Sequence, residues 1–152
     1  SALNRFLRKL LTWPERKYFY HRFADNTKWS GPEANEGLQK AAQFLAGRWA
    51  AKEAIRKACE HLGASNGFHH IIILPFASSK ASPEATSRPQ ALILRDRFCE
   101  PTRNPPENAT SPPVDFDIES LDGQLCEVSI SHDSQYATAV ALVPVVEEWQ
   151  PL

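Results

Sequence analysis

One short segment, residues 43–58, combines a single acidic side chain, that of Glu53, with a tryptophan and several cations. The tryptophan is Trp49, and the cations are Arg48, Lys52, Arg56 and Lys57. A carboxylate can hold a hard divalent cation such as Mg²⁺ while lysine and arginine hold phosphates, as in metal-assisted phosphoryl transfer. An ordinary surface pair of Glu53 with Lys57, four residues apart on a helix, is the alternative that spacing alone favours.

The helical period places Glu53 opposite the expected core. At about 100° per residue, one arc of the helix holds the buried stripe, which we expect to be Phe44, Ala51, Ile55, Ala58 and Leu62. The neighbours of Glu53 on the other face are Trp49, Arg56, Lys57 and Glu60, with the small Ala46 and Ala50. A tryptophan on a polar face indicates that another subunit or a ligand covers that face.

A second candidate segment, "SISHDSQYATAVAL", contains Ser131, His132 and Asp133 in succession. These residue types form the triad of many hydrolases, but neighbours on an extended strand point to opposite faces and cannot align as nucleophile, base and orienting acid. We therefore expect a polar strand end and turn, in which His132 is suited to contact a phosphate. The sequence contains no Walker-type loop or GxGxxG segment, so the common nucleotide-binding folds have no support.

Helices are predicted in the first part of the chain. Residues 4–23 read as two short helices, with Thr12 as an N-cap and Pro14 in the following turn. Residues 26–37 read as a loop, and a long helix is expected from Leu38 to Leu62, closed by Gly63.

Strands are predicted in the second part, over residues 68–74, 91–94, 127–131 and 136–143, with a turn at residues 122–123. Residues 75–113 hold eight of the twelve prolines and read as a loop or insertion. Helices followed by antiparallel strands predict an α+β fold in which an antiparallel sheet packs against the long helix. We expect residues 1–152 to form a single domain.

The composition limits the classes of partner. With 17 basic and 18 acidic residues, the charge balance gives no support to a nucleic acid or a membrane surface as partner. No apolar run approaches the ~20 residues of a membrane span, and no signal-peptide pattern is present. Three cysteines without a CxxC pair favour free thiols. The chain contains no methionine, so we expect Ser1 to be preceded by further residues in the working protein.

The segments "FLAGRWAAKEAIRKA" and "VSISHDSQYATAVAL" together resemble the two signature segments of the holo-acyl-carrier-protein synthase family, the short type of phosphopantetheinyl transferase. The pattern F-x3-R-x3-KEA-x2-KA is highly specific. The resemblance extends weakly over most of the chain: "FLRKLLTWPERKYF" is similar to the basic first helix and following turn, "FHHIIIL" to the central strand, and "SRPQALIL" to the strand after a Gly-Lys-Pro-type loop.

The resemblance implies an Mg²⁺-dependent enzyme that transfers phosphopantetheine from coenzyme A to a serine of an apo acyl carrier protein. Glu53 matches the metal-ligating glutamate, and Lys57 matches the lysine that contacts the diphosphate and the reacting hydroxyl, so both are expected to be catalytic. The other residues expected to contact coenzyme A are Arg48, Arg88, Ser131 and His132.

The resemblance also implies protein partners. Carrier proteins of this kind are acidic, and Arg5, Arg8 and Lys9 resemble the family's basic docking face, with a solvated helix end as the alternative. Short synthases assemble as trimers with each active site between protomers. We therefore expect a homotrimer with shared active sites, and we expect Trp49 to lie near the shared cleft.

The chain departs from the family pattern in three places. The family opens with a strand whose aspartate is the second magnesium ligand, and this sequence begins just after that position, so we expect the strand upstream of Ser1. Ser87 stands where a glycine is expected before Arg88. Residues 98–113 have no family counterpart and indicate a eukaryotic, fungal type of stand-alone member. From this we expect a mitochondrial enzyme, with a cytoplasmic one as the alternative.

Other functions remain open on the sequence alone. One is a transferase domain excised from a fungal fatty-acid synthase. Another is a catalytically inactive module that binds coenzyme A or a carrier protein. A third is a scaffold domain whose charged helix face is only solvated surface.

Overall fold

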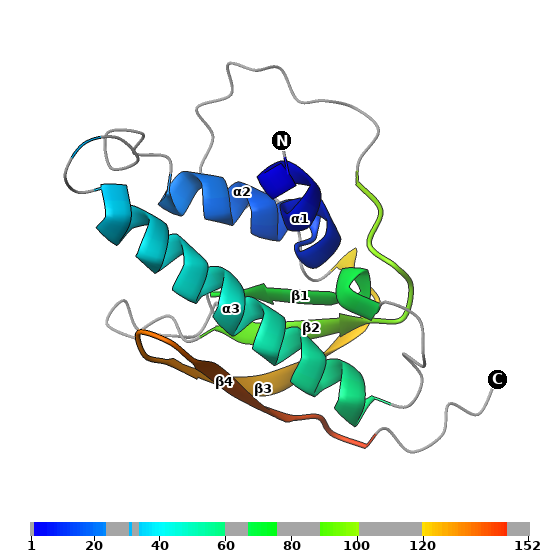
Figure 1. Ribbon diagram of the computed structural model, residues 1–152. Helices are drawn as coiled ribbons and strands as arrows, with labels where there is room; N and C mark the ends of the chain where they lie inside the picture. The colour runs from blue at the N-terminus through cyan, green and yellow to red at the C-terminus, as the bar shows by residue number, and fades with distance from the viewer. Residues whose placement is uncertain are drawn as a thin grey trace, which may run out of the picture.

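The computed structural model shows a long helix lying across one face of an antiparallel sheet, with two shorter helices beside it (Figure 1). The structure describes residues 2–23, 31, 34–59, 67–75, 89–100 and 120–145. The helices are α1 (Ala2–Leu10), α2 (Trp13–Arg22) and α3 (Ala34–Ala58), followed by a 3₁₀ turn, η3 (Gly67–His70). The strands are β1 (Ile71–Leu74), β2 (Gln90–Leu94), β3 (Gly123–His132) and β4 (Ala137–Leu142). The α+β prediction is confirmed.

The sheet is a meander in which every strand pairs with its neighbour in sequence. Its order is β1-β2-β3-β4, and all three pairings are antiparallel. Side chains alternate between the two faces along each strand, so Cys126, Val128 and Ile130 of β3 face α3 while Leu125 and Glu127 face away. The main core therefore lies between the sheet and α3. It is formed by Ala51, Ile55, Cys59, Ile71, Ile73, Ala91, Ile93 and Cys126.

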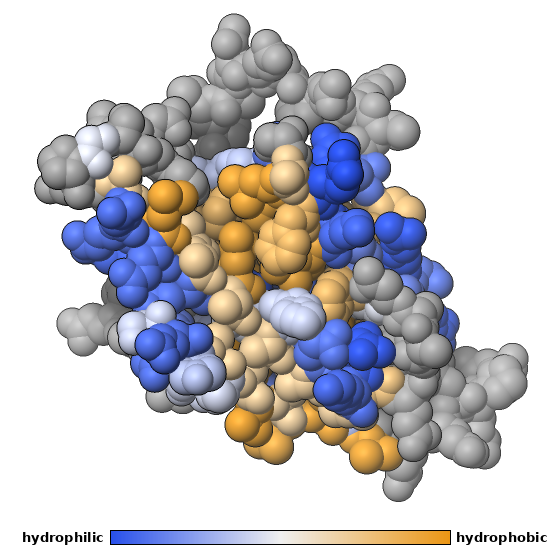
Figure 2. All heavy atoms as spheres, viewed as in Figure 1, coloured by the Kyte–Doolittle hydropathy of each residue, from blue (hydrophilic) through white to orange (hydrophobic). Residues whose placement is uncertain are grey.

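The opposite face of the sheet is covered over β1 and β2 but open over β3 and β4. Buried residues of β1 and β2 on this face form a smaller cluster with Tyr18, Phe98 and Leu121 packed against it. By contrast, Leu125 of β3 and Val140 and Leu142 of β4 are 51%, 64% and 70% exposed. Figure 2 shows hydrophobic residues along the lower edge of the molecule, where β4 runs. This part of the sheet thus leaves an apolar face without a cover from the described residues.

A second hydrophobic core packs the three helices against one another. Residues of α1, α2 and α3 share a buried cluster of Leu7, Leu10, Leu11, Phe19, Ala41 and Leu45. The chain can turn sharply between α1 and α2 because Thr12, with extended backbone angles, begins α2, and its backbone N–H donates to the carboxylate of Glu15. The predicted break near Thr12, with Pro14 in the first turn, is therefore confirmed.

The predicted limits of several elements were wrong. The long helix starts at Ala34, so residues 34–37 belong to the helix and not to the predicted loop. The segment 68–74 is a strand only from Ile71, because Gly67–His70 form the 3₁₀ turn. The hairpin strands run over Gly123–His132 and Ala137–Leu142.

Gly123 is not the turn residue that the sequence suggested. It pairs with Leu94 at the start of β3, where a Cβ atom would lie 2.6 Å from the backbone oxygen of Ile93. Glycine is needed here because the two backbones approach too closely for a side chain.

Some predictions lie outside the described residues. These include the end of the long helix at Leu62 and Gly63, the neighbour Glu60, the candidate Arg88, and the larger part of the Pro-rich region 75–113. Within the described ranges, no helix is long and apolar enough to cross a membrane.

The close contact of α3 with β3 gives a stability prediction. Replacing Gly47 by alanine in a helix normally stabilises by about 1 kcal/mol. Here the new methyl group would lie 2.8 Å from Cγ2 of Ile130. This atom is attached directly to the β-carbon of isoleucine, so it cannot move aside as the end of a long side chain could. We therefore expect Gly47→Ala to lower the free energy of unfolding, by about 1–3 kcal/mol, in a chemical denaturation measurement.

The matched control is Ala46→Gly at the neighbouring exposed position, where only the helix propensity of the residue changes. This variant should lower the free energy of unfolding by about 1 kcal/mol. A Gly47→Ala variant more stable than the parent would show that α3 does not pack against β3 as described.

Candidate functional site

The exposed face of α3 carries the only acidic side chain of the segment with which the sequence analysis began. Arg56 Nη2 donates to Glu53 Oε2 at 3.0 Å, and Lys57 Nζ lies 4.0 Å from the same oxygen. The side chain of Glu53 is 26% exposed and that of Lys57 is 73% exposed. Trp49, one turn earlier, is 47% exposed. The predicted grouping of a carboxylate, two cations and a tryptophan on the outer face is present.

The fit of this face to magnesium is incomplete. A carboxylate oxygen is the ligand type that Mg²⁺ takes in proteins. However, no group of three or more His, Cys, Asp or Glu side chains suited to a metal occurs among the described residues, and Glu53 is engaged by two cations. The described residues therefore supply one ligand and do not by themselves form a magnesium site.

The buried stripe of α3 differs from the predicted one. Ala51 and Ile55 are buried as expected, but Ala58 is exposed and Phe44 only half-buried. Arg48 and Lys52 are buried as well, and Lys52 pairs with Glu15 of α2.

Arg48 lies in an unusual position for a cation expected to contact coenzyme A. Its guanidinium lies 4.5 Å from the centre of the Phe44 ring, and burial lowers its pKa. Its buried Nε–H has no hydrogen-bond acceptor within the part of the chain that the structure describes. A buried donor without a partner is costly, so this site favours an anionic or water ligand beside Arg48.

The hairpin of β3 and β4 brings His132 toward α3 but not Ser131. Strand alternation places His132 on the same face as Ile130, which contacts α3, and Ser131 on the opposite face with Val140. Both residues are exposed. Gln43 Nε2 donates to the backbone oxygen of Asp133 at 2.9 Å, which fixes the turn beside the first half of α3.

Asp133 stabilises the turn itself. Its Oδ1 accepts the backbone N–H groups of Gln135 at 2.7 Å and Tyr136 at 2.8 Å, and these bonds lower its pKa. The carboxylate is therefore used in the turn and does not orient His132, in agreement with the rejection of a catalytic triad.

The site residues form two groups along α3. His132 and Arg48 lie near the contact of Gly47 with Ile130, whereas Glu53 lies roughly 9 Å beyond Gly47 at the rise per residue of a helix. A ligand that contacts both groups must be extended and must carry negative charge at more than one point. Arg88, which was expected to join them, lies outside the described residues.

The three cations expected to dock a carrier protein are on α1. Arg5, Arg8 and Lys9 are all exposed. In Figure 2, strongly hydrophilic residues gather over and beside α1, at the upper right of the view.

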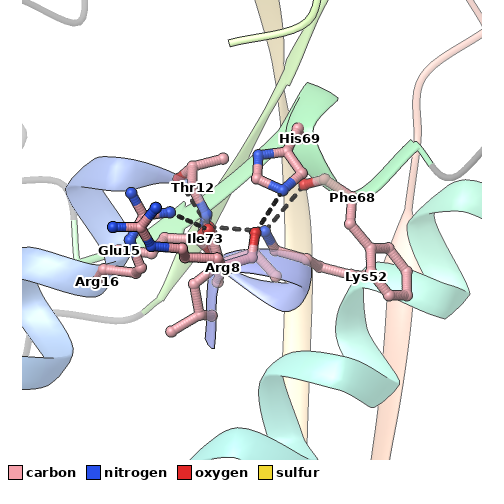
Figure 3. A network of polar contacts seen from close by, with 9 residues as sticks. Arg8, Thr12, Glu15, Arg16, Lys52, Phe68, His69 and Ile73 are labelled. Carbon is pink, nitrogen blue, oxygen red and sulfur yellow. Dashed lines mark hydrogen bonds and ion pairs between the residues drawn. The ribbon is translucent and has the colours of Figure 1, made fainter. Parts of the chain in front are cut away.

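Glu15 of α2 and Lys52 of α3 form a buried ion pair that was not predicted from the sequence (Figure 3). Lys52 Nζ donates to Glu15 Oε2 at 2.6 Å and to the backbone oxygen of Phe68 at 3.0 Å, and its side chain is completely buried. Glu15 Oε2 also accepts the N–H and the hydroxyl of Thr12, and Oε1 accepts the N–H of Ile73. One carboxylate thus joins α2, α3 and β1.

The sequence contains both residues of this pair, but each has a local interpretation that requires no distant partner. Thr12 and Glu15 have the spacing of a capping box, which accounts for Glu15 without a distant partner. Lys52 lies among other cations, so nothing in its spacing separates it from solvated lysines.

His69 lies next to this network. Its Nε2 is 2.8 Å from the backbone oxygen of Arg8, and burial, followed by the charge of Lys52, lowers its pKa. His70 Nδ1 likewise lies 3.4 Å from a backbone oxygen, that of Leu94 in β2.

Comparison with known proteins identifies the family. The sequence model of the 4'-phosphopantetheinyl transferase superfamily matches residues 2–103. The chain belongs to this superfamily. The match includes α1, α2 and α3, and therefore Arg48, Glu53 and Lys57, while the hairpin with Ser131 and His132 lies beyond it.

A named relative agrees with this assignment. The chain is 30% identical over 142 residues to 4'-phosphopantetheinyl transferase B, mitochondrial, of Aspergillus fumigatus. The matched region covers 91% of this chain and 77% of the relative. No solved structure gives a significant match.

The buried pair gives a prediction about stability. Removing one partner of a buried ion pair leaves an uncompensated charge, so Lys52→Met and Glu15→Gln should each lower the free energy of unfolding by about 3–5 kcal/mol. The double variant should lose clearly less than the sum of the two, in a double-mutant cycle measured by chemical denaturation.

The exposed pair of Lys40 with Glu36 on the same helix provides the control. Lys40→Met should lower the free energy of unfolding by less than about 1 kcal/mol, because this pair is exposed to solvent. Additive effects of the Glu15 and Lys52 substitutions would contradict the direct pairing.

His69 gives a prediction about pH. Because its pKa in the folded protein is below the usual value of about 6.5, the unfolded chain binds a proton that the fold excludes. Its contribution to stability is therefore present above pH 6.5 and is lost as the pH falls toward the folded pKa. The free energy of unfolding should decrease between pH 7.5 and 5.5, and His69→Gln should decrease less steeply. Identical slopes for parent and variant would rule out this role.

Proposed function

We propose that the protein transfers the 4'-phosphopantetheine group of coenzyme A to a serine of an apo acyl carrier protein. The observation that carries this proposal is the outer face of α3, where Glu53 is held by Arg56 and Lys57 in a segment matched by the superfamily model. These residue types suit a diphosphate substrate, because the lysine and arginine offset negative charge during phosphoryl transfer.

The roles follow from the positions along α3. Lys57, the most exposed cation of the face, contacts the diphosphate and offsets charge at the reacting phosphorus. Arg48, whose buried Nε–H has no acceptor among the described residues, and His132 contact the phosphates at the nucleotide end of coenzyme A. Ser131 and Arg88 remain proposed contacts, Ser131 from the outer face of β3. The attacking hydroxyl belongs to the carrier protein, so no covalent enzyme intermediate is required.

Magnesium is part of the proposal, with Glu53 as one ligand. The described residues form no group of three or more metal-ligating side chains around it. When bound, the ion would neutralise charge on the diphosphate.

We further propose a homotrimer with active sites shared between protomers. The apolar residues Leu125, Val140 and Leu142 on the open side of β3 and β4 support burial against another copy, because a soluble domain rarely leaves such a face uncovered. Exposed Trp49 supports a subunit contact beside the active face. Carrier proteins served by this enzyme are expected to be acidic and to contact Arg5, Arg8 and Lys9. The name of the Aspergillus fumigatus relative supports a mitochondrial location.

The second candidate function is an inactive module that binds coenzyme A or a carrier protein. The observation that favours it is the single carboxylate on the active face of the described residues. The deciding experiment incubates the protein with apo carrier protein, coenzyme A and Mg²⁺, and measures the mass of the carrier protein. A phosphopantetheine increment supports the enzyme, whereas coenzyme A binding without transfer supports the module.

The metal-ligand role of Glu53 gives a prediction. Glu53→Gln should lower the transfer rate by about 100-fold or more, with little change in the free energy of unfolding, because its ion pairs are partly exposed. Rates are measured over a titration of Mg²⁺.

The matched control is Glu36→Gln, which removes an exposed carboxylate from the same helix and should leave the rate unchanged. If Glu53→Gln transferred normally at limiting Mg²⁺, the assignment of Glu53 as a ligand would be wrong.

A further inference from the structure

A pocket of about 370 Å³ lies away from the α3 face, between the corner of α1 and α2, the 3₁₀ turn η3 and the segment that follows β2. The residues of interest in its lining are Arg8, Trp13, Arg16, His69, Arg97 and Glu100. None of the described residues expected to hold coenzyme A is in this lining. Figure 3 shows Arg8, Arg16 and His69 beside the Glu15–Lys52 network.

The pocket carries an excess of positive charge. Arg16 is paired with Glu100 at 3.1 Å, and its other terminal nitrogen donates to the backbone oxygen of Leu11. His69 is held toward its neutral form, since burial lowers its pKa. Arg8 and Arg97 are exposed, and the described residues offer neither of them an acidic partner. The positive charge left for a ligand is therefore that of two arginines, Arg8 on α1 and Arg97 in the segment after β2.

Trp13 adds a flat apolar surface to the lining of the pocket. Lys17 is not part of the lining, but its Nζ lies 4.3 Å from the centre of the Trp13 ring and so places a further cation beside that ring. Arginine and tryptophan are the side chains most often found at the centre of protein interfaces. The combination suits an acidic protein segment better than an isolated inorganic anion.

Arg8 belongs both to this pocket and to the row of cations on α1. A carrier protein that docks on Arg5, Arg8 and Lys9 would therefore lie over the mouth of the pocket. We propose that the pocket receives an acidic side chain of the carrier protein, so that the docking surface continues from α1 to Arg97. This inference rests on the proposed function, since it names a further contact of the same partner.

The test compares Arg97→Glu with Arg95→Glu. Both reverse one exposed arginine in the same segment, but Arg95 lies outside the pocket lining and faces Asp122 at 3.7 Å. The measurements are kcat, the KM for an apo acyl carrier protein of net negative charge, and the KM for coenzyme A. Affinity for the same carrier protein with its acceptor serine replaced by alanine is measured separately, by fluorescence anisotropy.

We expect Arg97→Glu to weaken carrier-protein binding and raise the carrier-protein KM by about tenfold or more, with kcat and the coenzyme A KM unchanged. Arg95→Glu should resemble the parent. A carrier protein in which one acidic residue is replaced by lysine should bind the Arg97→Glu variant more tightly than the unchanged carrier protein does. The same replacement should not tighten binding to the parent.

Three results would overturn the proposal. Equal carrier-protein KM values for Arg97→Glu and the parent would remove the pocket from the docking surface while leaving the proposed function intact. A rise in the coenzyme A KM alone would assign the pocket to the nucleotide. A parent protein that neither transfers nor binds the carrier protein would refute the proposed function and this inference together.

Discussion

The carboxylate of Glu15 is the interaction on which the arrangement of the described elements depends. It accepts hydrogen bonds from Thr12, Lys52 and Ile73, and so joins the start of α2, the middle of α3 and the third residue of β1. A buried carboxylate is tolerated only when it is paired and fully hydrogen-bonded, and this one meets both conditions. Its lysine precedes Glu53 directly, so the same contact fixes the rotation of α3 that turns Glu53 outward.

That rotation buries some of the cations of α3 and leaves others exposed. Lys52 is neutralised inside the protein, and Arg48 is buried against Phe44, where no described residue accepts a hydrogen bond from its Nε–H. Arg56 and Lys57 remain on the outer face with the carboxylate between them. The cations that stand close together in the sequence therefore lie in three different environments: Lys52 in a buried ion pair, Arg48 buried against Phe44, and Arg56 with Lys57 on the outer face.

The sequence predicted the class of fold, the order of its elements and the grouping of Glu53, Lys57 and Trp49, because all of these depend on local periodicity. It failed where a distant element decides the outcome. Helical geometry alone could not show that α2 covers Lys52, or that Ala58 is exposed, since both depend on where α2 and the sheet end. The separation of Ser131 from His132 follows from strand alternation and was foreseeable, whereas the pocket beside Arg97 requires segments far apart in the chain to meet.

The central claim is that coenzyme A binds along the outer face of α3, between the end of β3 and Lys57. The most direct measurement is the set of backbone amide chemical shifts on titration with coenzyme A. The account predicts changes over residues 48–57 and in the turn at residues 131–136, reduced by Lys57→Ala. Changes restricted to the pocket beside Arg97, with α3 unaffected, would contradict it.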